Sequence, residues 1–205
     1  MKRVEMKSVI AAISFAIFSS VVQAVPIFSD NFDANGLALN GTPTGWTVTN
    51  GTVDIIGNPG FFDFIPGSGR YIDLDGSTSD AGVLSRSLAL DAGVTYTLAF
   101  ELAGNQRNGI TEQVTVNFGG NTGNLYSLAQ TVGWTPYSLT FTPGASGNYV
   151  ISFENAGGDN IGMLLDDVTV DKQSQPVPEP GSLALLGFGL AGICVARRRK
   201  SIVNG

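Results

Sequence analysis

Residues 95–102 read Thr-Tyr-Thr-Leu-Ala-Phe-Glu-Leu, and this stretch decides the fold class. Its large apolar side chains, Tyr96, Leu98, Phe100 and Leu102, alternate with smaller or more polar ones. A period of two residues is typical of a strand in an antiparallel sheet, which buries one face and exposes the other to water. The stretch therefore predicts a half-buried β-strand.

The same alternation recurs further along the chain, in residues 113–118, 137–142 and 149–154. Segments such as Asp91-Ala92-Gly93 and Thr142-Pro143-Gly144 separate the runs and have the composition of turns. About eight to ten short strands joined by such turns predict an all-β domain. We expect an antiparallel β-sandwich of the jelly-roll kind over residues 25–171.

The N-terminus has the pattern of a secretory signal peptide. Three basic residues among the first seven precede an apolar run at residues 9–22. Val22-Gln23-Ala24 then places small residues at the two positions that a cleavage site requires. We expect residues 1–24 to be removed after Ala24; an uncleaved N-terminal anchor is the alternative.

The C-terminus has three consecutive parts after a polar linker at residues 172–177. Pro178-Glu179-Pro180 is stiff and extended, because each proline fixes its own φ and restrains the residue before it. Residues 182–196 are uncharged and predict a single transmembrane helix. The basic residues Arg197, Arg198, Arg199 and Lys200 follow and should stay cytoplasmic. A buried core helix is the alternative, and the adjacent cations argue against it.

This order of parts resembles the PEP-CTERM sorting signal over residues 178–200. The resemblance implies export across the inner membrane of a Gram-negative bacterium and processing by an exosortase near Pro178-Glu179-Pro180. It also implies membrane anchoring before processing, then a place at the cell surface or in the extracellular matrix. In that family such proteins accompany exopolysaccharide production and, by extension, biofilm.

Composition excludes several kinds of chemistry. The chain has no histidine, which rules out a Ser-His-Asp triad, a Cys-His pair and a His-ligated metal. Its one cysteine, Cys194, lies in the apolar tail, so the domain has no disulfide. Only Arg70, Arg86, Arg107 and Lys172 lie between the two ends, whereas all 17 acidic residues except Glu5 and Glu179 do. Such a domain repels nucleic acid and attracts cations, Ca²⁺ above all.

Two acidic segments are candidates for a cation. In residues 164–170 alternation places Asp166 on one face with Leu164, Val168 and Val170, and a carboxylate facing a core needs a partner. Asp33 ends the first expected strand, which in a jelly roll can lie beside the last. We therefore expect Asp33 and Asp166 to meet as ligands of Ca²⁺; the alternative is that they only cap turns.

A second resemblance covers residues 27–171 and is to the galactose-binding-like jelly rolls, which include many carbohydrate-binding modules. The matching segments are Asp-Asn-Phe-Asp at 30–33, Gly-Trp-Thr at 45–47, Tyr-Ile-Asp-Leu-Asp-Gly at 71–76, Tyr-Thr-Leu-Ala-Phe at 96–100, Trp-Thr-Pro-Tyr-Ser-Leu-Thr-Phe at 134–141 and Leu-Asp-Asp-Val-Thr-Val at 165–170. The resemblance implies a structural Ca²⁺ at Asp33 and Asp166, with Asp167 adjacent.

Sugar-binding modules stack pyranose rings on aromatic side chains beside polar groups. The aromatic candidates here are Trp46, Phe61, Phe62, Phe64 and Tyr71, and the polar ones are Gln106, Arg107 and Asn108. Packing over the end of the sandwich is the alternative for the three phenylalanines. Asp73 and Asp75 alternate with Ile72 and Leu74, which indicates outward-facing, solvated acids; a second cation site is the alternative.

No pair of carboxylates can be assigned as acid and base from the sequence, so we expect no enzymatic activity. The expected function is that of a non-catalytic surface or matrix protein, associated with exopolysaccharide or biofilm and binding glycans weakly. Two alternatives stay open: a purely structural matrix protein without a discrete ligand, and a small polysaccharide-acting hydrolase or lyase.

Overall fold

The computed structural model describes residues 26–60, 62–107, 109–120 and 123–173, together with Gly187, Gly189 and Leu190. The predicted signal peptide and the sorting residues Pro178, Glu179, Pro180, Arg197, Arg198 and Arg199 lie outside these residues, as do Phe61 and Asn108. In the part of the chain that is described, no helix is long and apolar enough to cross a membrane.

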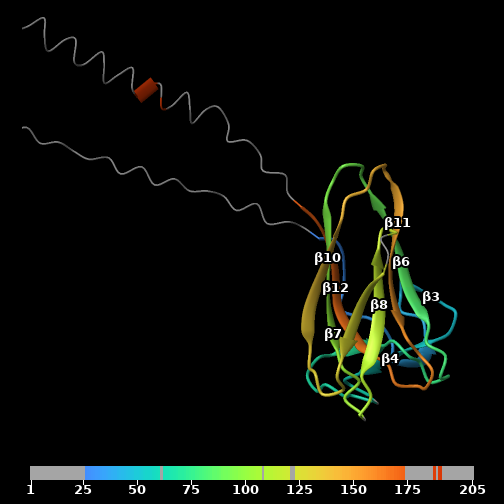
Figure 1. The fold of residues 1–205 in the computed structure, drawn as a ribbon. Coiled ribbons are helices and arrows are strands. Elements are labelled where there is room, and N and C mark those ends of the chain that lie inside the picture. The colour runs from blue at the N-terminus through green and yellow to red at the C-terminus, as the bar shows by residue number, and fades with distance from the viewer. Residues whose placement is uncertain are drawn as a thin grey trace, which may run out of the picture.

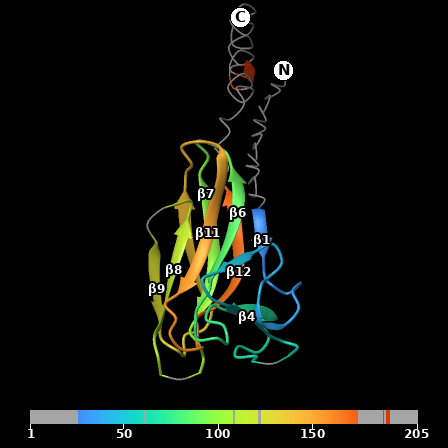
Figure 2. The same ribbon diagram turned by 90° about the vertical axis from the view of Figure 1, so that its right-hand side faces the viewer.

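Within the described residues, twelve strands form two antiparallel sheets that face each other, as the alternation predicted (Figure 1). The larger sheet has the order β10-β7-β12-β5-β4-β2, with β1 also paired to β12. The smaller has the order β3-β6-β11-β8-β9, and Figure 2 shows β6, β11, β8 and β9 side by side. The strands are β1 (Pro26–Asp30), β2 (Ala38–Gly41), β3 (Thr47–Thr49), β4 (Val53–Gly57), β5 (Arg70–Asp73), β6 (Val83–Leu90), β7 (Tyr96–Ala103), β8 (Glu112–Phe118), β9 (Asn124–Leu128), β10 (Thr135–Phe141), β11 (Gly147–Asn155) and β12 (Leu164–Lys172).

The core lies between the two sheets and contains the alternating side chains of the long strands. Leu98 and Phe100 of β7 meet Val116 of β8 and Phe153 of β11 there. The rings of Phe100 and Phe153 are 5.2 Å apart and nearly perpendicular, an arrangement that aromatic pairs prefer. The period of two therefore identified the buried face of these strands correctly.

A β-bulge in β12 changes which face its residues occupy. Asp166 pairs with Glu101 and Thr169 with Ala99, so Asp167 and Val168 together oppose Phe100. Asp167 takes the extra position with a φ of 49°. Leu165, Val168 and Val170 consequently enter the core, whereas Leu164 and Asp166 face the outer side of the sheet. The expectation that Asp166 shares a face with Val168 and Val170 is therefore wrong.

The loop between β4 and β5 covers part of this outer face. Ile56, Tyr71, Ala103 and Leu164 form a second apolar cluster, against which Phe64, Ile65 and Trp134 pack. The Tyr71 hydroxyl accepts hydrogen bonds from the backbone N–H groups of Phe64 (2.6 Å) and Ile65 (3.1 Å). The loop is thus held to the sheet and forms one wall of the site described next.

Candidate ligand-binding site

A pocket of about 210 Å³ opens on the outer face of the larger sheet, between the β4–β5 loop and the β5–β6, β7–β8 and β11–β12 loops. The strands supply its floor: Asp54 and Ile56 of β4 face outward, and Asp54 pairs across the sheet with Asp73 of β5. The lining residues are Asp54, Ile56, Phe62, Phe64, Asp73, Ser77, Arg107 and Asn160.

Asp73 lies at the base of the pocket and is almost fully buried. Its Oδ2 forms an ion pair with Arg107 Nη2 at 2.5 Å, and its Oδ1 accepts the backbone N–H of Gly162 at 2.9 Å. Burial raises the pKa of Asp73 to about 7 against the opposing effect of the Arg107 charge. Alternation predicts that β5 exposes this carboxylate to solvent, but the loops cover it and it lines the pocket instead.

Asp54 is also buried, and its oxygens are satisfied by neighbouring donors. Oδ1 accepts the backbone N–H of Asn40 at 2.6 Å, and Oδ2 accepts the Ser77 hydroxyl, also at 2.6 Å. These bonds fix the carboxylate in place, so it presents acceptor lone pairs to the pocket at a defined position.

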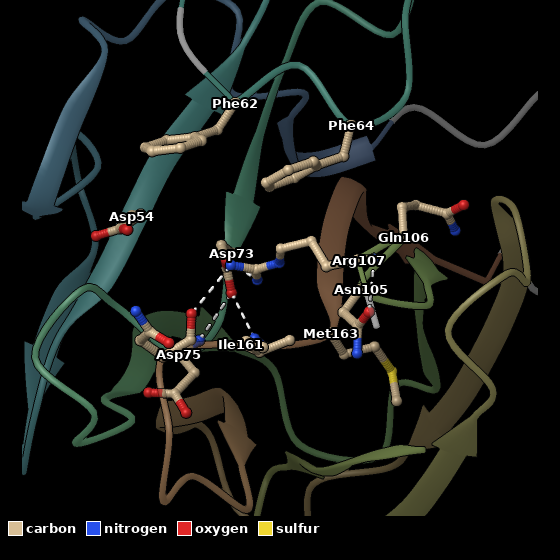
Figure 3. Close-up of polar contacts among 12 residues, drawn as sticks. Asp54, Phe62, Phe64, Asp73, Asp75, Asn105, Gln106, Arg107, Ile161 and Met163 are labelled. Carbon is tan, nitrogen blue, oxygen red and sulfur yellow. Dashed lines mark hydrogen bonds and ion pairs between the residues drawn. The ribbon is translucent and has the colours of Figure 1, made fainter. Parts of the chain in front are cut away.

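Two phenylalanines form the opposite wall (Figure 3). Phe62 is 52% exposed and adopts a φ of 55°, whereas Phe64 is partly buried against the apolar cluster. Their rings are nearly parallel, with centroids 5.9 Å apart, and the Arg107 guanidinium lies 4.8 Å from the Phe64 centroid. Arg107 thus connects the aromatic wall to Asp73, while its Nη1 donates to the Asn160 carbonyl at 3.0 Å.

Of the eight glycan-contact candidates, the structure brings Phe62, Phe64 and Arg107 to this pocket. Gln106 is close in sequence, but its amide donates to the carbonyls of Gly104 and Val132 and holds its own loop. Trp46 is only 6% exposed, within the core, and its Nε1 donates to Asp30 Oδ2 at 2.8 Å. Tyr71 is fully buried under the β4–β5 loop. Neither Trp46 nor Tyr71 presents a ring face to a sugar, so these two expectations are wrong.

Two of the three predicted metal residues, Asp166 and Asp167, line a different, polar cavity of about 260 Å³. The cavity lies where the partner of β12 changes from β5 to β1, and its lining includes Asn31, Glu101, Asp166 and Asp167. Asp166 is 6% exposed, and burial raises its pKa to about 8, with a further contribution from the charge of Asp167. The expectation that β1 lies beside β12 is confirmed.

Asp33 lies near this cavity, but its oxygens form hydrogen bonds with Arg70. Its Oδ1 accepts the backbone N–H of Arg70 at 2.8 Å, and its carbonyl accepts the Arg70 guanidinium at the same distance. The residue thereby ties the end of β1 to the start of β5. Among the described residues, no three acidic or thiol side chains are arranged to hold a metal ion as they stand.

Asp54 and Asn160 are pocket residues that the sequence analysis missed. Asp54 stands among apolar or small neighbours in Val-Asp-Ile-Ile-Gly at residues 53–57. A single carboxylate in such a strand is the feature of the sequence that could have indicated a site. Asn160 follows a glycine-rich turn and carried no signal of its own, because the turn's position over β5 depends on tertiary structure.

A family model described as "Protein of unknown function (DUF642)" matches residues 29–171. The chain belongs to the DUF642 family. A second model, the PEP-CTERM protein-sorting motif, matches residues 176–200, and this DUF642 protein is therefore an exported protein that is sorted through the membrane. No curated protein matches the chain.

Solved structures resemble the DUF642 domain at low identity. The CBM22-1 xylan-binding domain of Paenibacillus barcinonensis Xyn10C is 16% identical, with a TM-score of 0.47 over 76% of this chain and 99% of that one. The CBM22-1-GH10 modules of Clostridium thermocellum xylanase 10B, complexed with xylohexaose, are 18% identical with a TM-score of 0.43; the match covers 77% of this chain but only 29% of theirs. TmCBM61 in complex with β-1,4-galactotriose is 20% identical with a TM-score of 0.45, covering 63% and 90%. At these values the likeness is one of architecture, and what the site binds depends on its own residues.

Proposed function

We propose that this DUF642 protein is a non-catalytic surface protein that binds a glycan in the pocket between Phe62, Arg107 and Asp54. The observation that carries the proposal is the exposed ring of Phe62, which stands over a pocket lined by the Asp54 and Asp73 carboxylates. An exposed aromatic ring beside fixed hydrogen-bonding groups is the combination of contacts that sugar-binding sites use, and it supports a ligand here.

The pocket combines the two kinds of contact that a sugar requires. A pyranose has an apolar face, which can pack on the Phe62 ring, and a rim of hydroxyls. Those hydroxyls can donate to Asp54 and accept from the Arg107 guanidinium, both of which line the pocket. Because neighbours already fix both polar groups, little side-chain entropy is lost when a ligand binds.

Electrostatics favour neutral sugars over acidic ones. The cation of Arg107 is neutralised by Asp73, and Asp54 adds a second carboxylate to the pocket. Acidic residues also far outnumber the four cations of the domain. A polyuronate or sulfated glycan would be repelled at low ionic strength, so we expect neutral oligosaccharides to bind and polygalacturonate not to bind.

The test is a titration of the full-length chain, in mild detergent, with xylo-, cello- and galacto-oligosaccharides by calorimetry. We expect Phe62→Ala to lower the affinity for the best-binding oligosaccharide about tenfold, because one stacking contact of about 1.4 kcal/mol is lost. Leu125→Ala is the matched control, since Leu125 is a comparably exposed apolar residue on the other sheet. Equal affinity in wild type and Phe62→Ala would count against this site.

Beyond the site, the proposal extends to location and matrix association. The sorting motif supports delivery to the envelope with processing by an exosortase and anchoring through residues 182–196. We propose that the glycan belongs to an exopolysaccharide or biofilm matrix. A scaffold without a discrete ligand is the alternative, and the same titration separates the two.

An enzyme is the second candidate, because Asp54 and Asp73 line one pocket and the pKa of Asp73 is raised. Paired carboxylates with different environments are what glycoside hydrolysis uses. Against it, Asp73 is bound by Arg107 and two backbone N–H groups, and Asp54 by Ser77 and Asn40. Release of reducing sugar that disappears in Asp54→Asn would favour the enzyme.

The predicted Ca²⁺ site is also retained as a proposal, at Asp166 and Asp167 in the cavity beside β1. A buried carboxylate next to Glu101 and Asn31, with space for an ion, supports it. Asp33 would act from the rim through its charge, which already contributes to raising the pKa of Asp166.

A further inference from the structure

Asp75 is fully buried at the end of the sandwich, directly after β5. The β11–β12 loop covers it so closely that a Cβ on Gly162 would lie 2.3 Å from the Asp75 backbone nitrogen. Any side chain at position 162 would therefore push the loop away from the carboxylate. Figure 3 shows the Asp75 side chain turned away from the Asp73–Arg107 pair.

The Asp75 carboxylate lacks the donors that a buried charge needs. Neither oxygen is exposed, and neither has a hydrogen-bond partner of standard geometry within the described residues. The Asp159 backbone N–H is near enough to favour the ionised form slightly, but the charges of Asp159 and Glu112 oppose it. Burial and these charges raise the pKa of Asp75 to about 6.

The groups around Asp75 that could compensate the charge are used elsewhere. The Arg107 guanidinium is paired with Asp73. The amide N–H groups of Asn105 and Asn155 donate to Glu112, at 3.3 and 3.5 Å. Their oxygens accept the backbone N–H groups of Arg107 and Met163. A region with several acids and one committed arginine thus has an excess of negative charge and no free donor among these side chains.

We infer that Asp75 binds a divalent cation of the Ca²⁺ type, held between the β5–β6 and β11–β12 loops. Ca²⁺ accepts an irregular shell of carboxylate, carbonyl and water oxygens, which suits one buried carboxylate in a glycine-rich enclosure. Because no three acidic side chains of the described residues converge on one point, Asp75 is the direct side-chain ligand. The negative charges of Glu112 and Asp159 lie nearby and attract the cation. This site is separate from the cavity at Asp166, which lies where β1 replaces β5 along β12.

The cation would also act on the glycan pocket. Asp75 donates its backbone N–H to Asp73 Oδ1, and the loop over Asp75 carries Asn160, which lines the pocket. Fixing Asp75 therefore fixes two pocket residues. This consequence rests on the proposed glycan function, whereas the cation site itself does not.

The experiment uses the full-length chain in mild detergent with Asp166→Asn as the background, which removes the other proposed cation site. Thermal unfolding is recorded in EDTA and with Ca²⁺ at about 100 times its Kd, where a single site raises Tm by about 5 to 10 °C. We expect this rise in Asp166→Asn and also when Asp80→Asn is added, since Asp80 is an exposed acid of the same loop. We expect it to vanish when Asp75→Asn is added.

Without the metal, we expect the Asp75 substitution to change Tm in the opposite direction. In EDTA at pH 8, Asp75→Asn should raise Tm, because it removes a buried charge that has no partner. Two results would overturn the inference: a Tm of Asp166→Asn that does not change with Ca²⁺, or a rise in Tm with Ca²⁺ that persists when Asp75→Asn is added. If the double variant does not fold, Glu112→Gln in the same background takes its place, with at least a threefold weaker Ca²⁺ affinity expected by terbium displacement. An unchanged affinity would again contradict the site.

Discussion

At the scale of single residues, the buried carboxylates distinguish this domain from an ordinary sandwich. Alternation over residues 72–75 predicts that Asp73 and Asp75 are exposed, yet both are buried. Strand period predicts which face a side chain occupies, but not whether a loop from residues 156–162 covers that face. Asp166 was expected to be buried and is, although on the opposite side of the sheet from the one predicted.

Asp166 makes stability depend on pH. Its folded pKa of about 8 exceeds the ordinary aspartate pKa of 3.8, so the folded chain holds a proton that the unfolded chain releases. The free energy of unfolding should therefore fall as pH rises from about 4 to 8. In EDTA, Asp166→Asn should be more stable than wild type at pH 8, on the order of 3 kcal/mol, and should lose this advantage towards pH 4.

Urea unfolding across this pH range measures the effect, with Asp171→Asn as the control in the same strand. Added Ca²⁺ should recover stability in wild type at pH 8 through the Asp166 site. A pH profile that is identical in wild type and Asp166→Asn would show that the carboxylate is not held in a poorly solvated place.

At the scale of elements, the strands were predictable and the bulge was not. The period of two located the core faces of β7, β8, β10 and β11, because these strands alternate without interruption. In β12 the chain inserts one residue at Asp167, and aspartate is among the few non-glycine residues that tolerate a positive φ. Nothing in the sequence of residues 164–170 distinguishes a bulged strand from a regular one.

The bulge makes a prediction about backbone strain. Asp167→Gly should raise the free energy of unfolding by about 0.5 to 1 kcal/mol, because glycine adopts a φ of 49° without steric cost. Thr169→Gly, two residues along in regular strand, should lower it by a similar amount. Chemical denaturation of both variants measures this, and Asp167→Asn separates the removed charge from the backbone effect. A loss of stability in Asp167→Gly would mean that position 167 is not strained.

At the scale of the whole molecule, the chain joins an acidic DUF642 sandwich to a PEP-CTERM sorting tail. Composition, turn spacing and the order of the C-terminal parts predicted this organisation, because each of these features depends only on residues that are close together in the sequence. The candidate site was predicted in part: Phe62 and Arg107 stand in loops, where chemistry is often found. Asp54, Asp73 and Asn160 come from three separate segments that only the folded sandwich brings together.

The central claim is that a neutral glycan occupies the pocket beside Phe62. The most direct measurement is amide NMR of the isotope-labelled full-length chain in detergent, titrated with the best-binding oligosaccharide. The account predicts saturable shifts of the Phe62, Phe64, Arg107 and Asn160 signals, with those of β8 and β9 in the other sheet unmoved. Shifts confined to the smaller sheet, or no saturable shift with any neutral oligosaccharide, would contradict it.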